Sequence, residues 1–356
     1  MTAYDESPSS VAVRPGKQHA RRTSSKARRG PRPVRGAAPD AAWTVDCFQS
    51  ALARLDHELD DAIARSRRSG RGGGGEWFTR LGLSDAARLA EAIAGFGDAA
   101  RADEFGLDPE FEELVEPFFA FLYRRWWRVE ARGLGNVPAS GAALVVANHS
   151  GAMFPYDGAM LKMALRLEHP AGRELRPLID DFVFEVPWLA DLMARVGGVR
   201  ASPENARLLL GRGEVVSVFP EGLRGMKKKF ADRYRLQRFG RGGFVSLALK
   251  TSAPIVPVAV IGAEEIHPLL GTWQWPARLL GLPYFPVTPT FPWLGLLGLV
   301  PLPSKWILRF GEPIDLARRD GDPADPVHVD RLTEEVRETI QDLVEETRRE
   351  RGPAFV

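Results

Sequence analysis

The chain has 356 residues, of which 44% are hydrophobic and 26% are charged, and its formal net charge is +2. These proportions are ordinary for a globular protein and allow a sizeable core in one large domain or two modest ones. The single cysteine, Cys47, excludes an internal disulfide, and one Cys with six His offers no pattern at metal-ligand spacing. We therefore expect no disulfide framework and no metal site.

Residues 1–42 are predicted to be a disordered basic tail. Nine Lys or Arg and no acid lie between Arg14 and Arg35, and such a segment does not fold by itself. Its cations could tether the chain to anionic lipid, each contributing about 1 kcal/mol near a charged membrane, but we favour a solvated tail. No nucleic-acid recognition motif accompanies it, so no nucleic-acid partner is expected. The start of the chain also lacks the apolar core of a secretory signal, which fits a cytoplasmic location.

Residues 43–127 are predicted to be a helical region. Apolar residues recur at helical spacing from Val45 to Ile63, and this amphipathic pattern ends in the Arg- and Gly-rich linker Ser66–Gly75. Further helices are expected at 84–96, where Ser84 is a candidate cap, and at 109–127. The region carries no strand signal.

From Arg128 onward the pattern becomes an alternation of apolar strands and amphipathic helices, which indicates an α/β domain over 128–320 with a mixed, largely parallel sheet covered by helices. A charged C-terminal helix is expected within 321–356. The expected extended segments are 128–132, 142–147, 178–184, 215–219 and 255–261, and the expected helices are 158–167, 188–196, 205–210, 243–251 and 327–351.

The 26 residues between Arg278 and Lys305 carry no charge and are rich in Leu, Phe, Pro and Gly. Their length would suit a membrane span, but six prolines interrupt the segment and would leave backbone groups unsatisfied in lipid. Two interpretations remain open. The segment either dips Tyr284, Phe291 and Trp293 into the membrane interface or packs as a loop on its own domain.

The loop after the strand at 142–147 contains His149, and Asp157 follows eight positions later. A neutral imidazole can take a proton from a hydroxyl, and a carboxylate on its far nitrogen fixes the tautomer. Gly151 and Pro155 allow the loop to turn back so that the two side chains meet. Taken alone, such a pair is structural more often than catalytic.

The loop after the strand at 215–219 holds Glu221 and Arg224 beside the turn-forming Gly222. A guanidinium in such a loop can bind phosphate through two hydrogen bonds, and Arg200 is a second candidate. The neighbouring lysines of 227–229 are interpreted as a solvated charge run.

Four sequence blocks together resemble the PlsC-like superfamily of glycerol-phosphate and lysophospholipid acyltransferases. They occur in the family's order, and the likeness covers roughly residues 128–315. The blocks are His149 with Asp157, Gly197–Arg200, Phe219–Arg224 and Ala253–Val258.

The resemblance implies that His149 is the general base and that Asp157 orients it. It also implies that Arg200, Glu221, Gly222 and Arg224 bind the acyl acceptor, which is a glycerol-phosphate or a lysophospholipid. Ala253–Val258 corresponds to the block associated with the acyl donor. The donor is acyl-CoA or acyl carrier protein, with no other cofactor. An enzyme of phospholipid biosynthesis with such substrates is expected at the inner face of the membrane.

Two departures from the family pattern bear on the site. The commonest first block places the Asp five positions after the His, whereas position 154 here is Phe and the Asp comes later. The third block usually has hydroxyls where this chain has Leu223 and Gly225, which alters the hydrogen bonds offered to an acceptor. Two other classes of function stay open: a catalytically silent lipid-binding protein and an acyl-thioester hydrolase.

Overall fold

The computed structural model describes residues 102–355 except for 151–153, 185–186, 317–318, 320–321 and 323. These residues belong to one unit of the chain, Ala42–Val356. The predicted basic tail, the amphipathic helix after Trp43, the glycine linker and the helix at 84–96 lie outside the described residues and stay predictions.

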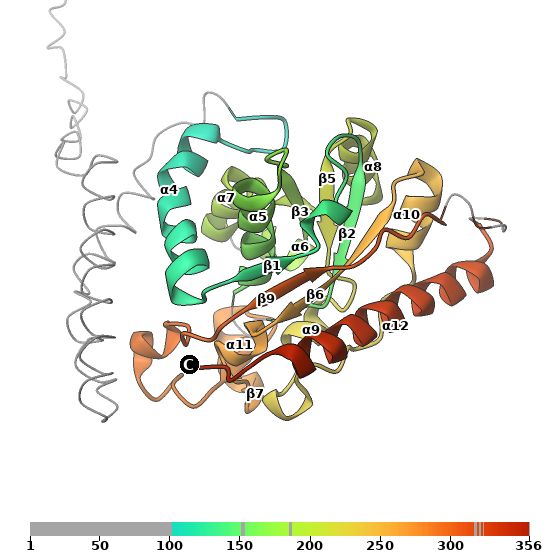
Figure 1. The fold of residues 1–356 in the computed structure, drawn as a ribbon. Coiled ribbons are helices and arrows are strands. Elements are labelled where there is room, and N and C mark those ends of the chain that lie inside the picture. The colour runs from blue at the N-terminus through green and yellow to red at the C-terminus, as the bar shows by residue number, and fades with distance from the viewer. Residues whose placement is uncertain are drawn as a thin grey trace, which may run out of the picture. The chain divides into compact units, whose positions relative to one another are not determined.

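A seven-stranded sheet forms the centre of the domain, in the order β1-β9-β6-β2-β5-β3-β4 (Figure 1). The five strands from β6 to β4 run parallel, β9 runs antiparallel to β6, and β1 runs parallel to β9. The predicted α/β class with a mixed, largely parallel sheet is confirmed. The strands are β1 Glu130–Arg132, β2 Ala143–Ala147, β3 Leu175–Ile179, β4 Val199–Arg200, β5 Val215–Val218, β6 Ile255–Ile261 and β9 Ile307–Phe310.

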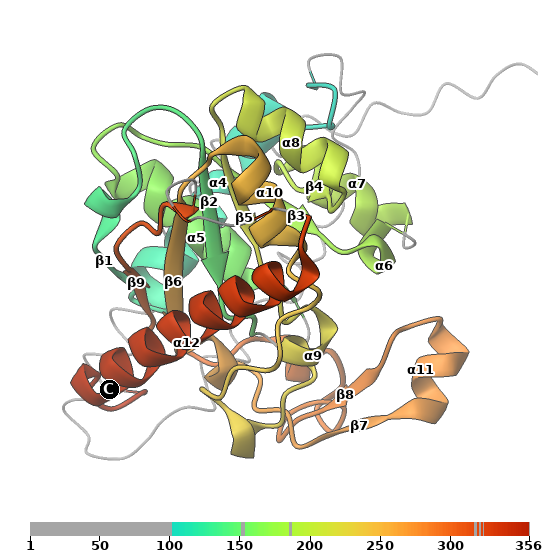
Figure 2. The same ribbon diagram turned by 90° about the vertical axis from the view of Figure 1, so that its right-hand side faces the viewer.

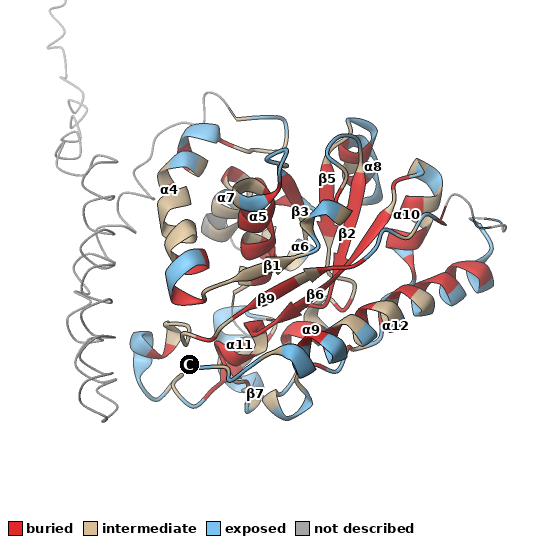
Figure 3. Cartoon of the chain, viewed as in Figure 1, coloured by how far each residue is buried: buried red, intermediate tan, exposed pale blue. Residues whose placement is uncertain are grey.

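Helices cover both faces of this sheet. Because successive side chains of a strand point to opposite faces, each strand contributes alternate residues to two separate cores. In β2, Leu144 and Val146 face a core closed by α8 Pro203–Gly211, α10 Gly243–Thr251 and α12 Pro326–Glu350. Val145 faces the opposite core, closed by α4 Pro109–Phe121, the π-helical turn Leu122–Trp126 and α5 Tyr156–Glu168. Because both faces are covered, the central strands are buried (Figure 3).

Three of these helices begin with the same local signal, a capping side chain followed by proline. Asp108 caps α4, Ser202 caps α8 and Asp325 caps α12, and each side chain accepts a backbone N–H of the first turn. Proline at the first helical position costs nothing there because its missing N–H would have no partner in the helix.

The prediction of an extended segment at 178–184 is wrong for the second half of that range. The structure begins β3 at Leu175 and ends it at Ile179, and Asp181–Phe184 forms the short helix α6, followed by α7 Pro187–Arg195. The start of the strand was hidden because Arg176 and Pro177 interrupt its apolar pattern. Strand β9 was not predicted, since it has only four residues and one of them is charged.

Most of the uncharged segment belongs to an ordered excursion that begins before it, at Gly271, and the segment is not a plain loop. β7 Gly271–Trp273 pairs with β8 Phe285–Val287, α11 Gln274–Leu280 lies between them, and a 3-10 turn spans Gly295–Leu299. Figure 2 shows this excursion projecting from the sheet beside the short helix α9 Leu223–Met226. Tyr284, for which a membrane-interface position was one of two open interpretations, is buried. No described helix has the length and apolar character required to cross a bilayer.

Candidate active site

Asn148, the first residue after β2, attaches the site loop to the neighbouring strand β6. Its buried side chain donates to the carbonyl of Val260 at 2.9 Å and accepts from the N–H of Val260 at 2.7 Å. These two bonds act like one further step of strand pairing, so the direction of the chain entering His149 is set by the sheet. Sequence reasoning assigned no role to Asn148.

His149 and Asp157 form the pair expected from the sequence. Nδ1 of the imidazole lies 2.7 Å from Oδ2 of Asp157, which lies in the first turn of α5. The same Oδ2 accepts from the N–H of Ser150, and Oδ1 accepts from the N–H of Gly158, both at 3.0 Å. The eight-residue spacing closes because α5 runs back under the end of β2 and presents its first turn to the loop. A carboxylate at a helix N-terminus is also stabilised by the helix dipole.

The electrostatic setting of His149 favours a strong base. Burial opposes the charged imidazolium, but the adjacent Asp157 carboxylate outweighs burial and raises the pKa of His149 above its ordinary value of 6.5. The Phe219 ring lies against the imidazole, with 4.7 Å between the ring centroids. A carboxylate on Nδ1 and an aromatic ring on the face hold the imidazole in one orientation.

Glu221 turns inward and ties the second loop to the first. Its Oε1 accepts from the backbone N–H of His149 at 2.9 Å, and its Oε2 accepts from the N–H of Gln237 at 2.6 Å. The side chain is buried. Contact with an acceptor remains a prediction for Glu221, while its observed contacts position the backbone of His149.

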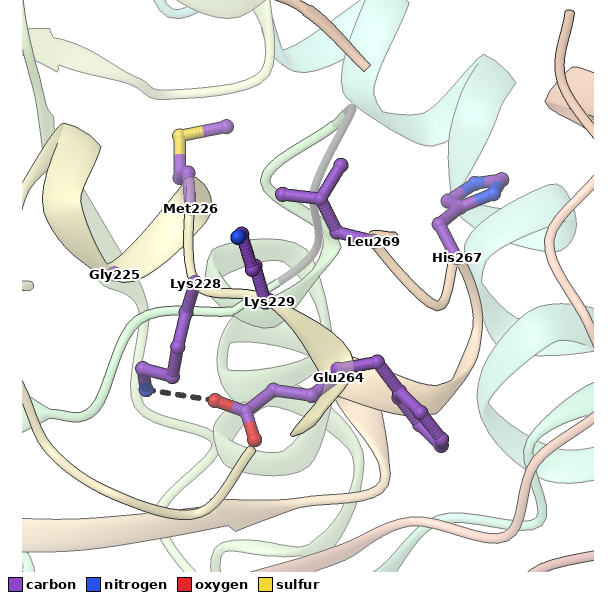
Figure 4. Close-up of a pocket in the computed structure, with 8 residues that line it drawn as sticks. Gly225, Met226, Lys228, Lys229, Glu264, His267 and Leu269 are labelled. Carbon is purple, nitrogen blue, oxygen red and sulfur yellow. Dashed lines mark hydrogen bonds and ion pairs between the residues drawn. The ribbon is translucent and has the colours of Figure 1, made fainter. Parts of the chain in front are cut away.

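Lys228 completes this buried cluster, so the interpretation of 227–229 as a solvated run is wrong for it. Its Nζ lies 2.7 Å from Glu264 (Figure 4). The same atom lies 3.3 Å from Glu221, and only 2% of the lysine side chain is exposed. Burial disfavours the ammonium, but the two carboxylates outweigh it and raise the pKa of Lys228. Sequence reasoning missed this because a lysine in a run of three carries no local sign of burial.

Two glycines shape the turn that brings α9 against the base. Gly222 has φ +53° and ψ −143°, a backbone conformation that residues other than glycine rarely adopt. At Gly225, a Cβ atom would lie 2.9 Å from the Cβ of both His149 and Glu221. The family pattern usually has a hydroxyl-bearing residue at position 225, and the structure supplies a steric reason why this chain has glycine there.

The two arginine candidates are placed differently. Arg224 is exposed on α9, and its side chain makes no ion pair or hydrogen bond with the described residues. Arg200 lies on the edge strand β4, where it pairs with Asp181 at 3.5 Å and covers the ring of Phe184. Because β4 is the third strand from β2, about 14 Å away at ordinary strand spacing, the structure does not bring Arg200 to the His149 pair.

A small cavity lies beside the buried cluster, between α9 and the segment that follows β6 (Figure 4). It is lined in part by Met226, Glu264 and His267. His267 is buried, neither of its ring nitrogens has a partner among the described residues, and burial lowers its pKa to about 4. Its imidazole is therefore neutral at pH 7. Within the described ranges, no three His, Cys, Asp or Glu side chains gather as a metal site would require.

Comparisons with known proteins identify the family of the chain. The acyltransferase family model matches residues 128–261. An uncharacterized protein of Mycobacterium tuberculosis is 53% identical over 268 residues, which cover 72% of this chain and 74% of that protein. The chain belongs to this acyltransferase family. The matched region of this acyltransferase runs from just before β1 to the last residue of β6 and contains every predicted site residue.

Other relatives of this acyltransferase are more varied. An uncharacterized Mycobacterium leprae protein is 50% identical, with 75% of this chain and 74% of that protein covered. A cattle protein named "DGAT1/2-independent enzyme synthesizing storage lipids" is 23% identical over an alignment that covers 63% of this chain and 61% of that protein. The crystal structure of the 1-acyl-sn-glycerophosphate acyltransferase PlsC from Thermotoga maritima is similar with a TM-score of 0.43 and 18% identity, covering 74% of this chain and 89% of that one.

Proposed function

We propose that this acyltransferase moves a fatty acyl group from acyl-CoA or acyl carrier protein to a hydroxyl of a glycerol-phosphate or lysophospholipid acceptor. The observation that carries the proposal is the buried His149–Asp157 pair at the carboxyl end of β2. In parallel sheets this end of the strands is where ligands bind. A catalytically silent member of the superfamily would not need to maintain this pair.

The pair supplies a proton acceptor on the substrate side of the ring. With Nδ1–H donating to Asp157, the lone pair is on Nε2, and no described residue hydrogen-bonds to Nε2. Nε2 takes the proton of the acceptor hydroxyl while the hydroxyl oxygen attacks the carbonyl carbon of the thioester. The tetrahedral intermediate then breaks the C–S bond, and the leaving thiolate takes the proton from Nε2. This sequence requires no acyl-enzyme, metal or further cofactor.

Other residues support the transfer without taking part in bond making. The Asp157 carboxylate stabilises the imidazolium that forms during transfer. Glu221 keeps the backbone of His149 in place through its N–H. Arg224 is exposed on α9, a helix that packs against His149, and its free guanidinium would bind the acceptor phosphate. Ala253–Val258, assigned by resemblance to the donor, leads into and forms most of β6 in the core beside β2.

The acyl acceptor is the least constrained part of the proposal. A phosphate-bearing lysolipid is favoured by the free guanidinium of Arg224. A phosphate-free acceptor is the second candidate, because the third block lacks its usual hydroxyls and the cattle relative is named for storage lipids. The transferred acyl chain and a lysolipid acceptor are both at home in a bilayer, so we propose that the protein works at the inner surface of the membrane.

The test is thiol release from a long-chain acyl-CoA by the purified full chain, with and without added acceptor. The acceptors are glycerol 3-phosphate, lysophosphatidic acid, lysophosphatidylcholine and monoacylglycerol, and His149→Ala is assayed beside the wild type. We expect release that depends on a phosphate-bearing acceptor and is lost in the variant.

The other outcomes are equally informative. Release that ignores the acceptor and yields free fatty acid would show a hydrolase. Release with monoacylglycerol alone would favour the phosphate-free acceptor. If neither acyl-CoA nor acyl carrier protein supports release, the transferase proposal is wrong and a silent lipid-binding protein is the better description.

A further inference from the structure

The excursion formed by β7, α11, β8 and the 3-10 turn leaves large apolar side chains in solvent. Trp275 is 76% exposed, Trp293 is 63% exposed and Leu296 is 75% exposed. We call these three, together with Leu279, Leu280 and Leu294, the apolar patch. Single exposed leucines are common on protein surfaces, but two tryptophans and four leucines on one excursion are not.

The apolar patch belongs to an ordered substructure. The rings of Trp273 and Trp293 meet edge to face at 5.9 Å, which joins β7 to the turn after β8. Trp273 also stacks on Phe285 at 6.4 Å, and Phe285 contacts Phe291 at 5.1 Å. These ring contacts join the half-buried Phe285 and Phe291 to the exposed Trp273 and Trp293, so the apolar patch is part of a packed substructure.

The excursion that carries the apolar patch has no acidic residue of its own, and the exposed Asp232 lies beyond Lys229 in the loop after α9. No acidic residue occurs from 266 to 311, whereas Arg278 is exposed on α11 itself. Lys229 is exposed in the loop after α9, and the Nζ of Lys227 lies 5.2 Å from the centre of the Tyr284 ring at the base of the excursion. An apolar excursion without acidic residues, with Arg278, Lys227 and Lys229 beside it, matches an anionic lipid bilayer, where tryptophan is favoured at the interface and cations meet headgroups.

The excursion is attached directly to the second loop of the active site. The N–H of Phe230 donates to the carbonyl of Leu269 at 2.8 Å, which connects the chain after α9 to the start of the excursion. Lys227 follows α9 at once, and Gly225 within α9 touches His149. Figure 2 shows α9 and the excursion side by side at one end of the domain. A surface bound by the apolar patch would therefore lie next to the base.

We propose that the apolar patch docks on an anionic lipid bilayer and that this docking presents bilayer-resident substrates to His149. The second clause rests on the proposed function, whereas the first does not. The lipid surface is preferred over a second copy of the chain because the border of the patch is basic and a copy would bring the same basic border against it, at an electrostatic cost.

The binding test uses the full chain and sedimentation with phosphatidylcholine vesicles, with and without about 30% phosphatidylglycerol. The variant combines Trp275→Ser, Leu279→Ser and Leu296→Ser. Its matched control combines Leu208→Ser and Val327→Ser, which replace exposed apolar residues on α8 and α12. We expect the patch variant to lose on the order of tenfold or more in vesicle affinity, because the lost apolar burial drives interfacial binding, and the control to bind like the wild type.

A second measurement identifies the side chains that enter the lipid. Brominated lipids should quench tryptophan fluorescence in the wild type, and Trp275→Phe with Trp293→Phe should remove most of the quenched signal. Equal binding by patch variant and control, or quenching that survives without these two tryptophans, would overturn the proposal. A change of oligomeric state in the patch variant without vesicles would overturn it in favour of a second copy.

Activity separates the two proposals. The patch variant should lose turnover of a lysolipid presented in vesicles but keep the wild-type rate in solution, with a short-chain acyl-CoA and a short-chain, water-soluble form of the same lysolipid. His149→Ala should bind vesicles normally and turn over neither. Vesicle binding without any turnover would support docking and refute the transferase, whereas turnover of vesicle substrates by the patch variant at the wild-type rate would refute presentation.

Discussion

The carboxylate of Glu221 accepts the backbone N–H of His149 at 2.9 Å, across 72 positions of sequence. Through this bond the loop after β5 holds the loop after β2. Lys228 then neutralises Glu221 from the other side. Asp157 thus contacts the ring of His149, Glu221 contacts its backbone N–H, and Lys228 lies on the far side of Glu221.

Asp157→Asn should slow the reaction and move its pH dependence. Burial lowers the pKa of His149, whereas the carboxylates of Asp157 and Glu221 raise it, so replacing Asp157 by its amide should lower this pKa. Because the base acts when neutral, the acid limb of the kcat/KM profile should shift to lower pH. The plateau should fall about 100- to 10,000-fold, since the imidazolium loses its partner. An acid limb that stays in place would contradict the assignment of His149 as the base.

Lys228→Met should destabilise the protein and lower kcat. It leaves the carboxylates of Glu221 and Glu264 buried without a cation, which typically costs about 3–5 kcal/mol. Urea unfolding measures the free energy, and steady-state kinetics should show a fall in kcat with a smaller change in KM. The matched control is Lys229→Met, because Lys229 is the adjacent, exposed lysine. Equal effects of the two substitutions would show that the buried cluster does not position the base.

Gly225→Ala should displace α9 from the base. The added Cβ would lie 2.9 Å from side-chain atoms of both His149 and Glu221, so one of them must move. A shift of a few tenths of an ångström to 1 Å should reduce kcat by about 10- to 100-fold. Gly211→Ala at the end of α8 is the control, since its Cβ would meet nothing within 4 Å. Full activity of Gly225→Ala would mean that the close packing on His149 is not needed.

Arg224→Gln should raise the KM for a phosphate-bearing acceptor by about tenfold or more, because a charge-assisted, bidentate contact is lost. The unfolding free energy should hardly change, since Arg224 is exposed and its side chain has no partner among the described residues. Arg207→Gln, at an exposed arginine on α8, should leave the KM unchanged. A KM for monoacylglycerol that also rises would show that Arg224 does not recognise phosphate.

Elements with a strong local pattern were predicted well from the sequence. The helix at 243–251 and the strand at 255–261 have the predicted bounds in the structure, and α7 begins and ends within one residue of its prediction. Apolar runs bounded by glycine and proline carry this information in a few adjacent residues. The prediction failed for the second half of 178–184 and for the strand β9. Short elements with charged or proline residues depend on neighbours far away in sequence.

The sequence by itself determined the family blocks, the α/β alternation and the pairing of His149 with Asp157, because each depends on residue types at short spacing. Only the tertiary structure decided that Lys228 is buried, that Gly225 has no room for a side chain, and that Arg200 lies strands away from the base. It also decided that Trp275 and Trp293 face solvent while Tyr284 does not. The physical reason is the same in each case: burial and close contact are properties of the packed sheet and its loops, and no local pattern encodes which distant segment will cover a side chain.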